Sequence, residues 1–164
     1  MVIAGGIALG VMAALSMRKR VEELRQLERI IGYMESEIRY KHALLQEAIE
    51  SVSGKVYFPF DSWLDKLSVI LKQDRERGFP EIWEDSLQEL RGLSHLKKDD
   101  VKYLISLGQV LGYLDVSAQQ RGMELEKENI HNLIVGLDKE LANNMKVSII
   151  MGTLGGIFLV LLLL

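Results

Sequence analysis

Both ends of this chain are apolar and free of charge, whereas everything between them is charged and patterned for helices. Residues 1–17 carry no ionisable side chain, and neither do residues 147–164, which end in four leucines. A surface helix of a globular protein alternates apolar and polar residues at a period near 3.6, but these two segments are apolar on every side. We therefore predict an N-terminal transmembrane segment over 1–17 and a C-terminal transmembrane helix over 147–164.

Each segment is just long enough to cross a bilayer. A helix of about 18 residues measures roughly 27 Å, close to the hydrocarbon thickness of about 30 Å. A signal peptide is the alternative for residues 1–17, but its basic residues should precede the apolar run, and here the basic residues 18–20 follow it. Small residues recur four apart, a spacing that permits close helix packing in lipid: Gly6 and Gly10, and Gly152 and Gly156.

Basic residues on the inner flanks of these segments predict their orientation. Residues 18–20 follow the first segment, and Lys139 and Lys146 precede the second. Because positively charged flanks stay on the cytoplasmic side, we expect residues 18–146 to form a cytoplasmic helical domain and both termini to lie outside. The chain has no cysteine, which excludes disulfides and thiolate chemistry.

The middle region, about 130 residues, is long enough for one domain with a modest core. The net charge is −3 and no basic block is present, so nucleic-acid binding is not indicated. The only short β-like run, at residues 56–58, is cut off by Pro59. We predict an all-α fold, a membrane-anchored small bundle of about six helices with an apolar transmembrane helix at each end.

Apolar spacing places these helices along the chain. A stripe from Leu24 to Ile38 predicts a helix over about 18–40, and its continuation in register leaves open one long helix or a break near His42; we favour the break. Pro59 and Pro80 start two further helices, and another begins at the acidic residues 99–100. From about residue 117 the last helix runs without a proline into the C-terminal span, a rod of about 48 residues and roughly 70 Å.

Residues that could carry chemistry are scattered. The three histidines lie far apart, which favours surface histidines over a metal site, and Trp63 and Trp83 lie on apolar stripes, which predicts core packing over a binding groove. Adjacent acids at 22–23 and 99–100 point to different helix faces, so we interpret them as solvated helix termini. Phosphate-binding loops and nucleophile elbows are absent. We expect no enzyme, no cofactor and no metal site.

Two stretches depart from ordinary helix composition. One is Glu-Ile-x-Tyr at 37–40, and the other is Leu-Gly-x-x-Leu-Gly-x-x-Asp at 107–115, followed by Gln119. Taken alone, the two glycines of the second stretch indicate close backbone packing or a turn near a helix end. In order and spacing, and with the apolar ends, the motifs resemble the stage III sporulation protein AB family of endospore-forming bacteria over essentially the whole chain. That family usually has a proline ahead of the leucine after the tyrosine, where this chain has Ala43 before Leu44.

The resemblance implies a small helical bundle similar to the F-type platform domains of type II secretion systems. It also implies a trans-envelope complex that joins mother cell and forespore, with a cytoplasmic secretion-type ATPase and ring-forming subunits between the two membranes. By analogy this chain would be the inner platform in the mother-cell membrane. Secretion platform proteins usually carry two copies of the domain and this chain has one, which leaves stoichiometry open and favours a homo-oligomer.

The expected function is therefore that of a non-enzymatic platform subunit, which couples the ATPase to the rings. The alternative is a membrane-anchored signal-relay module that passes conformational change through the long C-terminal helix; the near absence of residues outside the membrane argues against a receptor. We predict a partner-binding polar face, with solvated helix surface as the alternative for the same residues. Its members are Glu35, Glu37, Tyr40 and Glu47, with Asp115 and Gln119 as further members.

Overall fold

The computed structural model describes the backbone of residues 2–41, 43–113 and 115–163, and the side chains of residues 12, 14–41, 43–113 and 115–144. This part of the chain forms helices and no strand, which confirms the predicted all-α class; the β-like run at 56–58 lies in a connection. The elements, in order, are α1 (Val2–Lys41), α2 (Leu45–Ser53), α3 (Phe60–Gln73), α4 (Phe79–Leu93), α5 (Lys98–Leu111) and α6 (Val116–Leu163).

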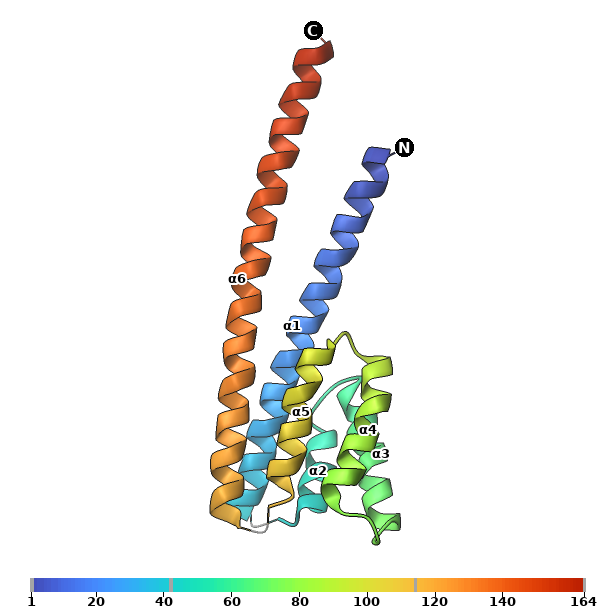
Figure 1. The fold of residues 1–164 in the computed structure, drawn as a ribbon, viewed down its shortest axis with the longest axis vertical. Helices are drawn as coiled ribbons and strands as arrows, with labels where there is room; N and C mark the ends of the chain where they lie inside the picture. The colour runs from blue at the N-terminus through green and yellow to red at the C-terminus, as the bar shows by residue number, and fades with distance from the viewer. Residues whose placement is uncertain (1, 42, 114, 164) are drawn as a thin grey trace.

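The helices form a closed ring in which each packs on its neighbours in the chain and the first packs on the last. The contacting pairs are α1 with α2, α2 with α3, α3 with α4, α4 with α5, α5 with α6, and α6 with α1. Two long helices thus run beside a cluster of four short ones, and both extend past the cluster in the same direction (Figure 1). Both termini lie at this end, which we call the proximal end; the opposite end of the bundle is the distal end.

The seam between α1 and α6 is antiparallel. Going from the proximal to the distal end, Arg25 pairs with Asp138 at 2.7 Å and Glu35 pairs with Lys127 at 3.7 Å. Between these pairs, Glu28 contacts His131 at 2.9 Å. These contacts are partly exposed, so each adds little free energy, and the buried stripes beneath them hold the seam together.

Both long helices are uninterrupted. The rod predicted at the C-terminus is α6, with 48 residues, and α1 continues through 40 residues where we expected separate helices over 1–17 and about 18–40. The change from apolar to charged residues near Arg18 alters the environment of a helix without ending it, because no proline interrupts the backbone there. At 1.5 Å per residue, α1 is about 60 Å long and α6 about 72 Å long.

The predicted break near His42 is confirmed, since α1 ends at Lys41 and α2 begins at Leu45. The backbone N–H of Ala43 bonds to the carbonyl of Glu37, six residues earlier, at 3.2 Å, which folds the chain back over the end of α1. A proline is therefore not needed at position 43 to end α1.

None of the helices, within the residues described, has an apolar stretch of the length that a bilayer crossing needs. The predicted C-terminal span, 147–164, and most of the predicted N-terminal span lie outside the described side chains. The two spans therefore stay predictions.

The core confirms the predicted packing of both tryptophans. Trp63 and Trp83 are fully buried, with ring centroids 5.0 Å apart and planes at 71°, an edge-to-face pair. The indole N–H of Trp83 donates to the carbonyl of Leu104 at 2.7 Å, and that of Trp63 donates to Ser86 Oγ at 3.0 Å. All buried apolar side chains described lie between Val21 and Leu137, so the 18–146 domain contains this core whole.

Glycines on α5 let α4 approach its backbone. A Cβ atom at Gly108 would lie 2.2 Å from Cδ1 of Trp83, and one at Gly112 would lie 2.7 Å from Cγ of Pro80. Both distances are far below van der Waals contact. The side chains of Trp83 and Pro80 therefore occupy the space that a Cβ atom at Gly108 or Gly112 would need. The Leu-Gly-x-x-Leu-Gly motif therefore serves close packing, one of the two explanations that its spacing allowed; the other, a turn near a helix end, also holds for Gly112, which follows α5.

Gly108→Ala should destabilise the 18–146 domain, because the new methyl group must displace a buried indole; overpacking of this kind costs about 1–3 kcal/mol. Gly136→Ala is the matched control, since Gly136 is also helical but has no atom within 4 Å of the added Cβ. We expect the control to stabilise the domain by about 0.5–1 kcal/mol through helix propensity. Urea unfolding followed by circular dichroism measures both, and equal shifts would contradict the packing role of Gly108.

Candidate partner-binding surface

The structure separates the six predicted face residues into buried and exposed sets. The expected exposure of Glu37 and Gln119 is not found, because both side chains are buried. Glu35 is half-buried on α1, with its carboxylate 3.7 Å from Arg39 and 3.7 Å from Lys127. Tyr40, Glu47 and Asp115 are exposed.

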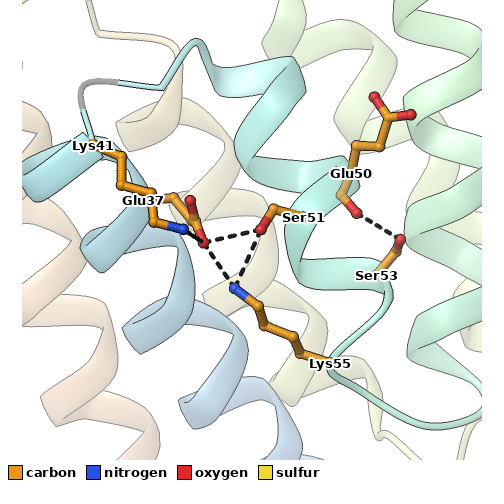
Figure 2. A network of polar contacts seen from close by, with 6 residues as sticks. All are labelled: Glu37, Lys41, Glu50, Ser51, Ser53 and Lys55. Atoms are coloured by element: carbon orange, nitrogen blue, oxygen red, sulfur yellow. Dashed lines mark hydrogen bonds and ion pairs between the residues drawn. The ribbon is translucent and has the colours of Figure 1, made fainter.

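Glu37 is only 5% exposed and is fully engaged inside the molecule. One oxygen, Oε1, accepts hydrogen bonds from Lys55 Nζ at 2.7 Å, Lys41 Nζ at 2.9 Å and Ser51 Oγ at 2.9 Å. Figure 2 shows this carboxylate facing Ser51 on α2 and Lys55 just beyond that helix. Glu37 therefore joins α1 to the next helix in the chain. The bond from Lys55, then those from Lys41 and Ser51, lower the pKa of the Glu37 carboxyl to about 2.

Gln119 and Asp115 organise the connection between α5 and α6. The amide Nε2 of Gln119 donates to the carbonyl of Leu111 at 2.7 Å, which satisfies a carbonyl at the end of α5. Asp115 Oδ1 accepts from the backbone N–H of Ser117 at 3.0 Å and from its hydroxyl at 3.0 Å, and these bonds lower the pKa of Asp115. Asp115, the residue before α6, thus caps the N-terminus of that helix.

The distal end carries a group of exposed apolar side chains that sequence patterns did not single out. We define the distal patch as Tyr40, Leu44, Tyr113 and Val116. All four lie at the ends of α1, α5 and α6 or in the two connections there, at the end away from the termini (Figure 1). Tyr40 is 73% exposed and Leu44 is 71% exposed, so the distal end displays large apolar side chains of the kind that protein interfaces bury.

Two exposed carboxylates border the distal patch. Glu47 lies in the first turn of α2, where its Oε2 accepts from the N–H of Leu44 at 3.3 Å, and Asp115 lies between Tyr113 and Val116 in the chain. The guanidinium carbon of Arg39 lies 5.6 Å from the centroid of the Tyr40 ring. The structure therefore brings Tyr40, Glu47 and Asp115 to one end of the bundle, and Glu37 and Gln119 shape the connections that hold them there.

Other predicted site residues have simpler outcomes. The packing glycines Gly6, Gly10, Gly152 and Gly156 lie outside the residues whose surroundings are described. Among the described residues, His, Asp and Glu side chains form no group that could hold a metal ion. His95 and His131 are exposed, as the sequence indicated.

The interpretation of both acidic pairs as solvated is wrong for one member of each. Asp100 is buried and accepts from Arg20 Nε and Nη2, both at 2.7 Å, while its Oδ2 also accepts from the N–H of Lys97 at 2.7 Å. Glu23 is buried and bonds to the backbone N–H of His95 at 2.7 Å and to its Nδ1 at 2.8 Å. Asp100 lies in the first turn of α5 and His95 in the connection before it, so both interactions tie the proximal part of α1 to the start of α5. Their partners are 72 and 80 residues away, so spacing along the chain could not reveal them.

Glu37→Gln should lower the stability of the 18–146 domain in a pH-dependent way. A carboxyl whose pKa falls from 4.5 in its ordinary state to about 2 in the folded protein stabilises the fold above the ordinary value. That contribution is lost as pH falls through 4.5 towards about 2. The difference in free energy of unfolding between the original protein and the variant, from urea titrations, should be constant near neutral pH and shrink across this window. A difference independent of pH would contradict the ion-pair assignment.

Asp100→Ala should cost about 3–5 kcal/mol, because it leaves the Arg20 guanidinium buried without its partner. Asp99→Ala is the matched control, since the neighbouring carboxylate is exposed and pairs with Lys102 at 2.8 Å. Exposed pairs are worth less than about 1 kcal/mol. Thermal unfolding of the 18–146 domain compares the two, and similar losses would show that Arg20 and Asp100 are not buried together in solution.

Comparison with known proteins covers the full chain. The family model for stage III sporulation protein AB matches residues 1–164. Stage III sporulation protein AB of Bacillus subtilis (strain 168) is 27% identical over 145 residues, which cover 88% of this chain and 84% of that protein. A solved structure of stage III sporulation protein AB has the same fold, with a TM-score of 0.69 and 23% identity over 76% of this chain and 97% of that chain. The chain belongs to the stage III sporulation protein AB family.

Proposed function

We propose that this chain is a non-enzymatic platform subunit of a trans-envelope sporulation complex. It is anchored in the mother-cell membrane by residues 1–17 and 147–164, and its 18–146 domain faces the cytoplasm. There it couples a secretion-type ATPase to ring-forming subunits between mother cell and forespore. Family membership supports the role in sporulation; the arrangement of the two ends of the bundle supports the platform role.

The membrane anchor is supported by where the long helices leave the bundle. The outermost side chains that pack on the core are Met17 on α1 and Leu141 on α6, which face the same end. Beyond both, the chain soon loses all charge. Two helices that leave a charged domain side by side and turn apolar are suited to entering one bilayer together.

The flanking charges support the cytoplasmic placement. Arg18, Lys19, Lys139 and Lys146 border the apolar segments and are the residues that the positive-inside bias counts. Arg20 contributes less to this argument than the sequence suggested, because its guanidinium is buried against Asp100. The domain then projects from the membrane with its distal patch facing away from it.

One observation carries the platform role: the distal patch lies at the far end of the same two helices that enter the apolar segments. A partner bound to Tyr40 or Val116 contacts the end of α1 or the start of α6 directly. No proline interrupts either helix between that contact and its apolar segment. The apolar side chains would supply the contact area, and Glu47 and Asp115 would orient a basic partner surface. A single bundle offers one such patch, so a homo-oligomer would present several to the ATPase.

Tyr40→Ser combined with Leu44→Ser should abolish co-purification of the ATPase with the tagged full-length chain from solubilised membranes of sporulating cells. Both side chains are exposed, so the variant should keep its melting temperature. Val69→Ser combined with Ile70→Ser is the matched control, an exposed apolar pair on α3, and should retain the ATPase. Retention by the distal variant, or equal loss from both variants, would refute the distal patch as the docking surface.

A further inference from the structure

A second group of exposed aromatic and basic side chains lies at the proximal end of the bundle. Tyr57 is 74% exposed and Phe58 is 62% exposed, both in the connection between α2 and α3, and Leu93 is exposed at the end of α4. This connection and the one between α4 and α5 lie on the side of the bundle that faces the termini (Figure 1). Large aromatic rings have no folding reason to be displayed in a connection, since burying them would stabilise the domain.

These side chains are held against the part of α1 that leaves the bundle. Lys19, Phe58, Pro59 and Leu93 line one open hollow of about 260 Å³. The backbone N–H of Tyr57 donates to Gln26 Oε1 at 3.0 Å, which fixes the connection to α1. We call Lys19, Tyr57, Phe58 and Leu93 the proximal rim.

The exposed charge around the proximal rim is mainly positive. Lys19, Lys97 and Lys98 are exposed there, and Glu22 is an exposed acid beside them. Among the other acids nearby, Glu23 pairs with His95, Asp100 with Arg20 and Asp99 with Lys102, while exposed Glu140 lies close enough to Arg20 to raise, together with Asp100, the pKa of its guanidinium. A surface with aromatic rings and excess lysines fits the interface of a membrane that contains anionic lipids, where aromatic belts and basic side chains concentrate.

The apolar segments lead directly from this rim. Leu15 and Met12 on α1 are exposed along the helix just beyond Met17, the outermost α1 residue packed on the core. If the acyl chains of a bilayer cover Leu15 and Met12, the apolar layer begins within one or two helical turns of Lys19. The headgroup layer of that bilayer would then meet Phe58 and Leu93. This continuity selects lipid over a protein subunit as the occupant.

We propose that the proximal rim rests on the cytoplasmic membrane surface, with Phe58 and Tyr57 in the headgroup region and Lys19, Lys97 and Lys98 against anionic headgroups. This inference rests on the membrane anchor proposed above. It adds that the soluble bundle itself touches the bilayer at a third place besides its two anchors. The contact would hold the domain at one angle to the membrane and so set the direction in which the distal patch points.

Quenching of tryptophan fluorescence by brominated lipid tests the contact in the full-length protein. The chain is reconstituted in vesicles of phosphatidylcholine and phosphatidylglycerol, with bromine on the acyl carbons nearest the headgroup or with none. Phe58→Trp reports on the rim, Leu15→Trp on the anchor, and Tyr40→Trp on the distal end as the matched exposed aromatic. The signal of the unsubstituted protein, from buried Trp63 and Trp83, is subtracted.

We expect brominated lipid to reduce the emission of Phe58→Trp and Leu15→Trp and to leave Tyr40→Trp unchanged. Quenching of Leu15→Trp alone would overturn the rim contact while leaving the anchor in place. Failure to quench Leu15→Trp would refute the anchor itself. Phe58→Trp emission that is blue-shifted but not quenched would show a protein neighbour on the rim, and equal quenching of Tyr40→Trp would show a bundle lying flat; either result overturns the proposal. Replacing phosphatidylglycerol with phosphatidylcholine should weaken the quenching of Phe58→Trp, which separates the lysine contribution from the aromatic one.

Discussion

The antiparallel pairing of α1 with α6 is the constraint on which the rest of the molecule depends. The first and last helices of the chain lie together, so the four short helices between them must leave α1 at its distal end and return to α6 at that same end. This requirement places the end of α1 and the start of α6 at the same end of the bundle, where the distal patch lies. It also directs both chain ends the same way, so that two charge-free segments can share one bilayer.

Buried polar contacts fix the position of α1 against the short helices at two levels. Near the proximal end, Arg20 and Glu23 reach to Asp100 and His95, and near the distal end Glu37 gathers Lys41, Ser51 and Lys55. Hydrogen bonds to charged groups are directional, so these contacts specify how α1 is rotated about its axis, which apolar stripes alone define loosely. That rotation of α1 also determines where its exposed side chains lie at the proximal and distal ends of the bundle.

Sequence patterns predicted most of the fold because its signals are local. The 3-4 spacing of Leu24 to Ile38, the prolines at the starts of α3 and α4, and the proline-free run after residue 117 each act within a few turns, and the structure confirms them. The motif at 107–115 likewise indicated close packing, although not that Trp83 and Pro80 fill the space. The candidate surface was predicted less well. Glu37 looked like an exposed acid because its partners Ser51 and Lys55 lie in a later part of the chain. Likewise, no sequence pattern around Asp100 indicated its partner Arg20, 80 residues earlier. The exposed Leu44 and Tyr113 could be found only once the ends of the helices were placed.

Because α1 is one uninterrupted helix, the bundle must move together with the apolar segment at the start of that helix. Neither α1 nor α6 contains a proline, so helix and domain must tilt as one body. The part of α1 from Lys19 to Tyr40 is about 32 Å long at 1.5 Å per residue. Transmembrane helices adjust their tilt to the thickness of the bilayer, and a change of about 10° would carry Tyr40 sideways by roughly 5 Å. In the proposed membrane-anchored arrangement, a local thinning of the bilayer would therefore push Tyr40 sideways by about one turn of helix, and the proximal rim, resting on the membrane surface, would resist that push.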